Sequence, residues 1–309
     1  MRIGILGDTH YTNKKPARRL DDFWETQKRK TRQALGIFNK RGCDCVIQVG
    51  DTFDNPMVSY SVVSELIEMF RDYENPIFVV FGQHDLFGHS SVTLPNSPIK
   101  VLESAQAISI LTHLPNFVGF NGDSQGIQVY GAGFGQEIPK PNSHTDYNVL
   151  VTHRMIGDRP LFPDQELENP VQFLKTHPEY NLIVAGDYHY RFISRYQGRV
   201  IVNPGALVRK SISQFDLEHE PAVMVFETTT GEIEVVKLDI EPVDRVFDMT
   251  PVQKRDDSKL AKFIEDLRKQ HGESDHIGWR HRLIQTMDEK GCSAEARRII
   301  DQALEEIHK

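Results

Sequence analysis

The sequence predicts an α/β (α+β) fold in which two stacked mixed β-sheets are flanked by helices, with a small helical appendage at the C-terminus. Two observations predict it. In the first half of the chain, short apolar and β-branched runs alternate with longer amphipathic stretches, as in layered α/β domains. From residue 180 onward the apolar runs follow one another with turn residues between them, which indicates a strand-rich and partly antiparallel second half.

Length and composition agree with this architecture. The chain has 309 residues, of which 39% are hydrophobic and 26% charged, enough for one large core and an appendage. The first apolar run meets Asp8 far short of the roughly 18 residues that span a bilayer, so we expect no signal peptide and no membrane contact. Three cysteines are too few and too irregularly spaced for a disulfide framework, so we expect thiols in a reducing cytoplasm.

The expected elements can be placed in order along the chain. Amphipathic helices are expected at 21–41 and 58–73, where residues such as Phe38 and Leu66 recur at helical spacing. After Pro251 the chain becomes polar and helical, so we divide it into a domain at 1–250 and a helical segment at 251–309. Strands are expected at 2–6, 45–49, 77–81, 127–134, 148–152, 182–186, 199–203, 221–228 and 233–240.

The net charge is −8, from 36 Lys and Arg against 44 Asp and Glu, which is unusual for a protein that binds a polyanion. The segment 251–309 is balanced, so the acidic excess falls in 1–250. Metal-binding carboxylates would be part of this excess, and bound cations would offset them locally.

Polar residues of the metal-binding types follow several of the expected strands. One such residue after a strand is more often a hydrogen-bonded structural group than a ligand. Five groups, each at the carboxyl end of a strand, are difficult to explain by chance, because this edge is where sites form in open sheets. The groups are Asp8-Thr9-His10, Gly50-Asp51-Thr52-Phe53-Asp54, Gly82-Gln83-His84-Asp85, His153 and Asp187-Tyr188-His189.

This ordered set resembles the calcineurin-like metallophosphoesterase superfamily, whose pattern is D-x-H, G-D-x-x-D, G-N-H-D/E, a single His and G-H-x-H. The resemblance covers residues 4–209 and implies two facing mixed sheets wrapped by helices around two divalent cations. It implies that Asp51 bridges the cations, that His84 faces the scissile phosphate and that Asp85 orients His84. Helix capping is the alternative role for Asp85 and for Asp54. The resemblance assigns one cation to Asp8, His10, Asp51 and His189, and the other to Asp51, Gln83, His153 and Asp187.

Two residues depart from the family pattern. Gln83 stands where Asn is usual, and Asp187 stands where the first His of G-H-x-H is usual. If both bind, the second site has three oxygen ligands and one imidazole, which suits Mn²⁺ or Mg²⁺ better than Zn²⁺. We therefore expect Mn²⁺, with Mg²⁺ as the alternative; a weakened second site is the competing interpretation.

The form of the motifs bears on the substrate. Phosphoprotein phosphatases of this superfamily read G-D-x-x-D-R and G-N-H-E, whereas this chain has Asn55 and Asp85 at the last positions. The G-D-x-F-D and G-Q-H-D forms and the helical tail are more similar to the SbcD-type nucleases of DNA repair and recombination. That resemblance implies DNA as substrate, docking of 255–309 on an SbcC-type coiled-coil ATPase, and a possible homodimer; a packed small domain is the alternative for the tail.

A basic cluster could meet DNA phosphates, or it could be a solvated helix face, because Asp21, Asp22 and Glu25 interleave with it. Tyr11 and Tyr188 flank expected ligands and could stack on a base or simply pack. The basic residues are Lys14, Lys15, Arg18, Arg19, Lys28, Arg29, Lys30 and Arg32, with Arg209 and Lys210 from a later turn.

Three classes of function remain open on the sequence. The first is a metal-dependent DNA exonuclease or endonuclease, favoured by the motif form, the tail and the basic cluster. The second is a small-molecule phosphodiesterase or nucleotidase. The third is a non-catalytic binding module, which would require lost ligands or a lost His84, and neither is lost outright.

Overall fold

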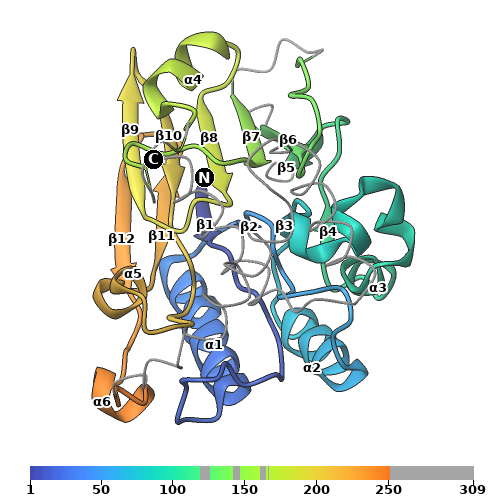
Figure 1. Cartoon of the computed structure of the whole chain (residues 1–309). Helices are drawn as coiled ribbons and strands as arrows, with labels where there is room; N and C mark the ends of the chain where they lie inside the picture. The colour runs from blue at the N-terminus through green and yellow to red at the C-terminus, as the bar shows by residue number, and fades with distance from the viewer. Residues whose placement is uncertain (119–125, 142–146, 161–164, 166, 251–309) are drawn as a thin grey trace, which may run out of the picture. The chain divides into compact units, whose positions relative to one another are not determined.

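Two six-stranded mixed sheets face each other in the computed structural model, which describes residues 1–118, 126–141, 147–160, 165 and 167–250 (Figure 1). Met1–Met249 form one compact unit. The predicted fold of two mixed sheets flanked by helices is confirmed. The helical segment expected at 251–309 lies outside the described residues, so its structure and the boundary before it stay predictions.

The first sheet has four adjacent parallel strands, with antiparallel pairing at one edge. Its strand order is β12-β11-β1-β2-β3-β4, with β1 to β4 parallel and β11 antiparallel to both β1 and β12. Ile5 is paired with Ile47, which is paired with Phe78, so the three motif-bearing strands run side by side in one direction. Its strands are β1 (Arg2–Leu6), β2 (Cys45–Gln48), β3 (Ile77–Val79), β4 (Ser109–Ile110), β11 (Ala222–Glu227) and β12 (Ile233–Lys237).

The second sheet repeats the plan, with parallel strands inside and antiparallel strands at the edges. Its order is β5-β6-β7-β8-β10-β9, and β7 and β8 lie at its centre with His153 paired to Gly186. Its strands are β5 (Asn116–Val118), β6 (Ile127–Ala132), β7 (Asn148–His153), β8 (Leu182–Gly186), β9 (Phe192–Tyr196) and β10 (Arg199–Asn203).

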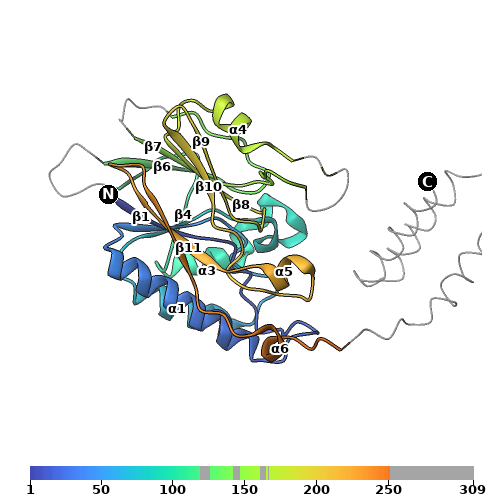
Figure 2. The ribbon, with the colours of Figure 1, turned by 90° about the vertical axis from the view of Figure 1, so that its left-hand side faces the viewer.

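Helices cover the outer faces of both sheets. Figure 2 shows α1 beneath the first sheet and α4 above the second. α1 begins after Asp22, whose side chain accepts a hydrogen bond from the Glu25 amide, and ends at the left-handed Gly42. No helix of the described ranges is long and apolar enough to cross a membrane. The helices are α1 (Phe23–Arg41), α2 (Tyr60–Arg71), α3 (Pro98–Ser104), α4 (Pro170–Thr176), α5 (Gln214–Glu218) and α6 (Val243–Val246).

Apolar side chains fill the space between the two sheets and the space beneath the helices. Val49 from the first sheet and Val184 from the second are fully buried in the same cluster. Phe38 of α1 packs on the outer face of the first sheet, and Phe173 of α4 packs on that of the second. The strand ends that carry the motifs are therefore held by close-packed layers on every side.

The elements that were not expected are short or lie at an edge. β9 was missed because its residues alternate between buried and exposed and include Arg195, although the Gln197-Gly198 turn after it was recognised. Both turn residues have positive φ, 50° and 78°, as a tight hairpin requires. α3 and α4 have seven residues each, too few for a helical period to be visible. The buried Cys43 and Cys45 are free thiols, and Cys292 lies outside the described residues.

Candidate metal centre

The loops that follow five strands meet between the two sheets. Residues after β1 are joined to residues after β2 by backbone hydrogen bonds, such as that from the His10 amide to the Asp51 carbonyl at 2.9 Å. The two sheets are joined where the Asp187 amide donates to Asp8 Oδ1 at 3.1 Å. The carboxyl ends of strands from both sheets therefore supply one site, as the sequence predicted for the motif residues.

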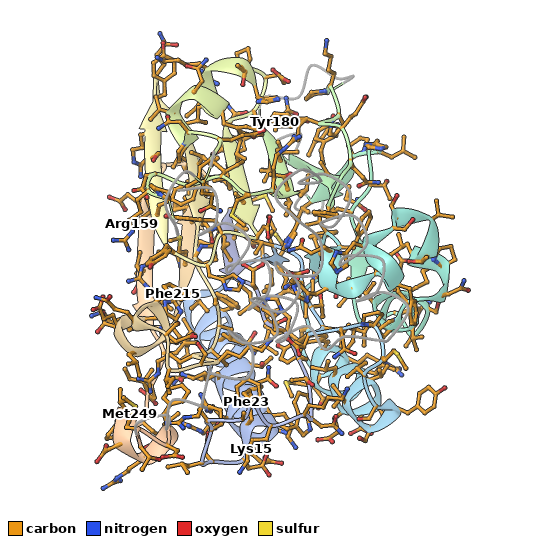
Figure 3. All side chains as sticks on the ribbon, viewed as in Figure 1. Lys15, Phe23, Arg159, Tyr180, Phe215 and Met249 are labelled. Atoms are coloured by element: carbon orange, nitrogen blue, oxygen red, sulfur yellow. The ribbon has the colours of Figure 1, made fainter. Side chains whose placement is uncertain are left out.

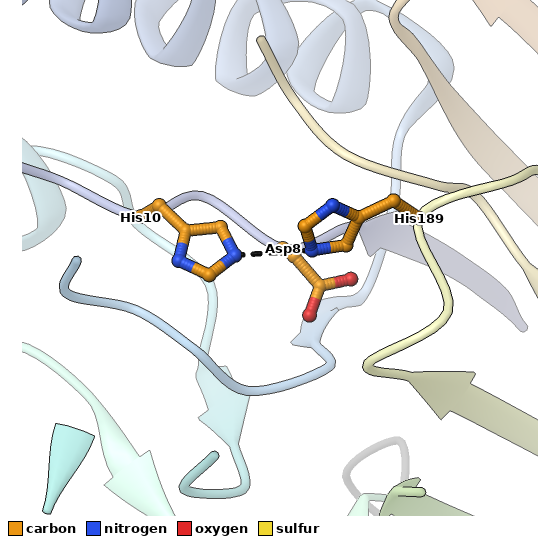
Figure 4. Close-up of side chains that lie close together, drawn as sticks. All are labelled: Asp8, His10 and His189. Atoms are coloured by element: carbon orange, nitrogen blue, oxygen red, sulfur yellow. Dashed lines mark hydrogen bonds between the residues drawn. The ribbon is translucent and has the colours of Figure 1, made fainter. Parts of the chain in front are cut away.

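Asp8, His10 and His189 form the first group of candidate ligands (Figure 4). The two imidazoles point their Nε2 atoms at each other, 3.1 Å apart, and the Asp8 carboxylate lies beside them. His10 Nε2 is also 3.8 Å from Asp51 Oδ2. Burial lowers the pKa of both His10 and His189, so both rings are neutral and offer a lone pair to a cation.

Asp51, His153, Asp187 and Gln83 form the second group. His153 Nε2 lies 3.3 Å from Asp51 Oδ2 and 3.9 Å from Asp187 Oδ1. Its Nδ1 lies 2.7 Å from the Val49 carbonyl oxygen, which can only accept a hydrogen bond, so Nδ1 carries a proton. The backbone thus aims Nε2 of His153 at the carboxylates, as a metal ligand requires.

Five buried atoms of these groups have no hydrogen-bond partner among the described residues. They are Asp8 Oδ2, His10 Nδ1, Asp51 Oδ2, Gln83 Oε1 and His153 Nε2. Buried polar atoms are normally paired, so a set of unpaired atoms in one place fits a site that binds a ligand. Carboxylate and amide oxygens and imidazole nitrogens are donors that fit divalent cations. Asp51 Oδ2 approaches both groups, which suits the bridging position expected for Asp51.

Burial and mutual charge set the protonation of this centre. Burial raises the pKa of Asp8 to about 7, although the positive charge of His153 opposes the effect. Burial alone would also raise the pKa of Asp51, but the positive charge of the nearby His153 lowers it well below the usual range. Burial disfavours the charged form of His153, yet the charge of Asp51 and its neighbours raises its pKa to about 10. Divalent cations bind at sites where buried carboxylates concentrate negative charge in this way.

Three of the expected ligands have a left-handed backbone, which was not predictable from the sequence. The φ angles are 46° at His10, 45° at Asp51 and 73° at Asp187. Residues other than glycine rarely take this conformation, and it is concentrated at functional sites where the surrounding structure enforces it. Here the turns aim side chains from the ends of β1, β2 and β8 into the space between the sheets.

Glycines precede the ligands because a side chain would collide with the site. A Cβ atom on Gly82 would lie 2.1 Å from Asp51 Oδ1, and one on Gly50 would lie 2.4 Å from His153 Nδ1. Gly50 also has a φ of 106°, which an L side chain rarely adopts. The close approach of loops from both sheets therefore explains these two glycines of the motifs.

His84 lies beside the candidate metal centre and keeps one ring nitrogen available to a partner. Its Nδ1 lies 2.9 Å from the Asp54 carbonyl oxygen, so Nδ1 carries the proton and Nε2 is left for another partner. Its ring centroid is 5.0 Å from that of His10. The His84 amide donates to Asp51 Oδ1 at 2.8 Å, which fixes both residues together. This position fits the expected contact with a scissile phosphate.

The expectation that Asp85 orients His84 is wrong, and so is its assignment as a catalytic residue. Asp85 is fully buried and accepts hydrogen bonds from the amides of Phe53 at 2.8 Å and Gly82 at 2.9 Å. The Asp54 carbonyl orients His84 instead. Asp85 is thus a positioning residue that ties the loop after β2 to the loop after β3.

Replacing Asp85 by Asn tests this positioning role. The amide keeps the size of the side chain but turns an NH₂ group toward backbone N–H groups that need an acceptor. We expect affinity for Mn²⁺ to fall by about 10- to 100-fold, as for groups that orient metal ligands, measured by isothermal titration calorimetry. Asp72→Asn on the surface is the matched control, and equal affinities in the two variants would contradict the role.

Some side chains of the predicted basic cluster are exposed, and others are buried or paired. The prediction that Arg19 and Arg209 contact DNA is wrong, because both are buried: Arg19 pairs with Asp21 at 2.6 Å and Arg209 donates to the Glu241 carbonyl at 2.6 Å. Lys28 and Lys30 are buried as well. Arg18 lies 3.8 Å from Asp248. Lys14 and Lys15 are exposed, and Lys210 forms an ion pair with Asp54 at the edge of the centre.

The burial of Lys30 predicts how stability varies with pH. Burial lowers its pKa to about 8, and its Nζ donates to the Asp239 carbonyl at 2.7 Å. The unfolded chain therefore binds the extra proton between about pH 8 and 10.4, and stability rises with pH across this window. We expect a gain on the order of 2–3 kcal/mol in the free energy of unfolding, measured in urea. Lys30→Met should lose this dependence; an equal slope in both proteins would contradict it.

Tyr11 and Tyr188 are packing residues and not stacking platforms. Both are fully buried. The Tyr11 hydroxyl lies 2.7 Å from Thr31 Oγ1, and the Tyr188 hydroxyl donates to the Arg159 carbonyl at 2.8 Å. Of the two interpretations of these tyrosines, packing is the one that the structure supports.

Comparison with known proteins agrees with this geometry. Residues 1–231 match the calcineurin-like phosphoesterase superfamily domain. No curated protein matches the sequence. The fold is similar to that of an archaeal phosphodiesterase, at 17% identity over 77% of this chain and 100% of that one, with a TM-score of 0.41.

Two further solved structures are similar to this chain at low identity. One is a putative 5′-nucleotidase from Staphylococcus aureus, at 15% identity over 86% of this chain and 58% of that one, with a TM-score of 0.46. The other is a dimetal phosphatase from Danio rerio, at 12% identity over 77% of this chain and 99% of that one, with a TM-score of 0.45.

Proposed function

Because the chain belongs to the calcineurin-like phosphoesterase superfamily, we propose that it is a two-metal phosphodiesterase that cleaves DNA as an exonuclease or endonuclease. The observation that carries the proposal is the convergence of unpartnered buried ligand atoms from both sheets beside His84. Members of the superfamily use divalent metals, and this chain retains a donor for every expected ligand position.

The residues would divide between two cations. Asp8, His10 and His189 would hold one, and Gln83, His153 and Asp187 would hold the other, with Asp51 shared. Bound divalent cations supply charge stabilisation for a phosphoryl oxygen and lower the pKa of a water molecule. His84, with Nδ1 fixed by the Asp54 carbonyl, presents Nε2 to the leaving oxygen or to charge that develops on the phosphate.

Charge and motif form favour DNA over a phosphoprotein. Asn55 stands where phosphoprotein phosphatases carry an arginine that grips the phosphoryl group. Lys210 forms an ion pair with Asp54 and is close enough to His10 for its charge to lower the pKa of His10, so a cation for a substrate phosphate lies beside the centre. The exposed Lys14 and Lys15 follow the first motif and add contacts for a phosphate backbone. The net charge of −8 opposes binding of a polyanion. We therefore expect the bound cations and these lysines to attract phosphates locally, at the centre.

The partner is a further part of the proposal. By its resemblance to SbcD-type nucleases, the chain would be the nuclease subunit of a repair or recombination complex. The segment 251–309 would dock on an SbcC-type coiled-coil ATPase, and two copies would form a homodimer. Co-purification of the full chain with such an ATPase, compared with a chain that ends at Thr250, tests the docking.

A small-molecule phosphodiesterase or nucleotidase is the second candidate, because the same centre would hydrolyse a nucleotide ester. Digestion of end-labelled linear duplex DNA with Mn²⁺, beside a chromogenic phosphodiester, separates the two. Cleavage of both substrates supports the nuclease, whereas cleavage of the small diester alone favours the second candidate. Activity on neither would contradict both.

The choice of metal is tested at Asp187. Its carboxylate oxygen lies 3.9 Å from His153 Nε2 and accepts from Gln83 Nε2 at 2.8 Å. Exchanging this oxygen for an imidazole should favour the softer Zn²⁺ over Mn²⁺. We expect Asp187→His to raise the ratio of Zn²⁺ to Mn²⁺ affinity by about tenfold or more. Unchanged metal affinity in Asp187→Ala would show that Asp187 is not a ligand.

A further inference from the structure

Three side chains from distant segments form a row of contacts next to the candidate metal centre. The guanidinium carbon of Arg159 lies 4.1 Å from the centroid of the Tyr190 ring. The Tyr190 ring in turn meets the Phe215 ring at 4.2 Å between centroids. We call Arg159, Tyr190 and Phe215 the stacking group.

The stacking group is adjacent to a metal ligand. Tyr190 follows His189 directly in the chain, and the Phe215 ring lies 6.4 Å from the His189 ring. Figure 3 shows Arg159 and Phe215 on the same side of the molecule. A base on the stacking group is therefore within the span of one nucleotide from a phosphate at the centre.

The polar ends of the group are only partly engaged within the protein. Arg159 is exposed, and in the described part of the chain its guanidinium has no acidic partner; it lies over the ring of Tyr190 and beside the hydroxyl of Tyr188. The Tyr190 hydroxyl likewise has no hydrogen-bond partner in these ranges, and its ring is partly exposed. A group that served packing alone would bury these rings, as the neighbouring Tyr188 is buried.

The loop that carries Phe215 is rigidly connected to Lys210. Asp216 accepts hydrogen bonds from the Lys210 amide at 2.9 Å and from the Ser211 amide at 2.9 Å. The Ser213 hydroxyl also donates to Asp216 at 3.1 Å. A lysine for a phosphate and an aromatic ring for a base are thus held at a fixed separation, which reduces the entropy lost on binding.

We infer that the stacking group is a subsite for a nucleobase of the substrate, next to the phosphate that is cleaved. The inference rests on the proposed phosphodiesterase function and names its substrate class: a nucleotide unit with an unpaired base. Aromatic rings and arginine stack on any base, so the subsite would be tolerant of sequence. A duplex would have to present a frayed or extruded base to use it.

Two chromogenic probes test the subsite with Mn²⁺ as the metal. Thymidine 5′-(p-nitrophenyl phosphate) carries a base, and methyl p-nitrophenyl phosphate carries none. We expect Tyr190→Leu to lower kcat/KM for the thymidine probe by about 10- to 100-fold and to leave the methyl probe unchanged. The exposed Arg159→Gln should act in the same direction without disturbing folding, and Tyr60→Leu, at a side chain that is 93% exposed, is the control.

The outcomes separate this inference from the proposed function. An equal fall for both probes, or no fall for either, would overturn the subsite while the phosphodiesterase activity stands. If the wild type hydrolyses neither probe, the proposed function fails, and binding decides the subsite. In that case thymidine 5′-monophosphate should bind at least about tenfold more tightly than 2-deoxyribose 5-phosphate, by calorimetry with and without Mn²⁺, and Tyr190→Leu should remove the difference; equal affinities would overturn the subsite.

Discussion

Asp51→Asn should abolish metal-dependent phosphodiester hydrolysis, lowering kcat/KM by about 1,000-fold or more. Asp51 Oδ2 is a buried, unpartnered oxygen that lies 3.8 Å from His10 Nε2 and 3.3 Å from His153 Nε2. A metal that stabilises transition-state charge contributes several kcal/mol, and each 1.36 kcal/mol is a factor of about ten in rate. Losing the shared carboxylate charge should weaken both cations at once.

The substitution is chosen so that the fold survives it. The carbonyl oxygen of an asparagine can still accept the hydrogen bond that the His84 amide gives to Asp51 Oδ1. Rates are to be measured on the chromogenic diester and on labelled DNA across a range of Mn²⁺ concentrations, with thermal unfolding of the metal-free proteins alongside. Asp72→Asn is the control at an exposed carboxylate. More than about a tenth of the wild-type rate at saturating Mn²⁺ would contradict a bridging role for Asp51.

Gly82→Ala should disrupt the centre through a single methyl group. Its Cβ would lie 2.1 Å from Asp51 Oδ1 and 2.5 Å from the Asp51 amide nitrogen, and a backbone atom cannot rotate away as a flexible side chain can. Either the loop after β3 or the shared ligand must move. We expect a loss of about 1–3 kcal/mol in stability and a fall in Mn²⁺ affinity and rate of about 100-fold, as misplaced catalytic groups show.

Gly36→Ala provides a matched control for this methyl group. Gly36 lies inside α1, and a Cβ there would have no atom within 4 Å. The exchange should raise stability by about 0.5–1 kcal/mol, because alanine favours the helix, and should leave metal binding unchanged. If Gly82→Ala retains wild-type Mn²⁺ affinity, the close approach of the two loops does not hold in solution.

The candidate site was predictable as a set of residues because its ligands follow strands. An apolar run that ends in Asp, His or Gln can be recognised locally, and parallel strands place their carboxyl ends at one edge. This sufficed for Asp8, Asp51 and His153, which the structure brings to the same place. For Asp85 the sequence left capping and orientation of His84 both open. The structure decides for capping, because Asp85 accepts hydrogen bonds from backbone amides after two different strands and the Asp54 carbonyl holds His84.

Burial distinguished residues that look alike in the sequence. Arg19 and Lys14 belong to one basic stretch, yet the first is 4% exposed and the second lies on the surface. Tyr188 and Tyr190 both neighbour His189, yet only Tyr190 reaches the surface beside Arg159. Exposure depends on which distant segment packs over a side chain, and local sequence patterns carry no information about that.

The sequence by itself determined the layered α/β class, the positions of most strands along the chain and the residues at their ends, because period and strand-end chemistry are local properties. The tertiary structure alone decided three things. They are the left-handed turns at His10, Asp51 and Asp187, the lack of room for a methyl group at Gly82, and the contact of Phe215 with Tyr190. Each depends on contacts between segments far apart in the chain, and the packing of both sheets enforces conformations that no residue would prefer on its own.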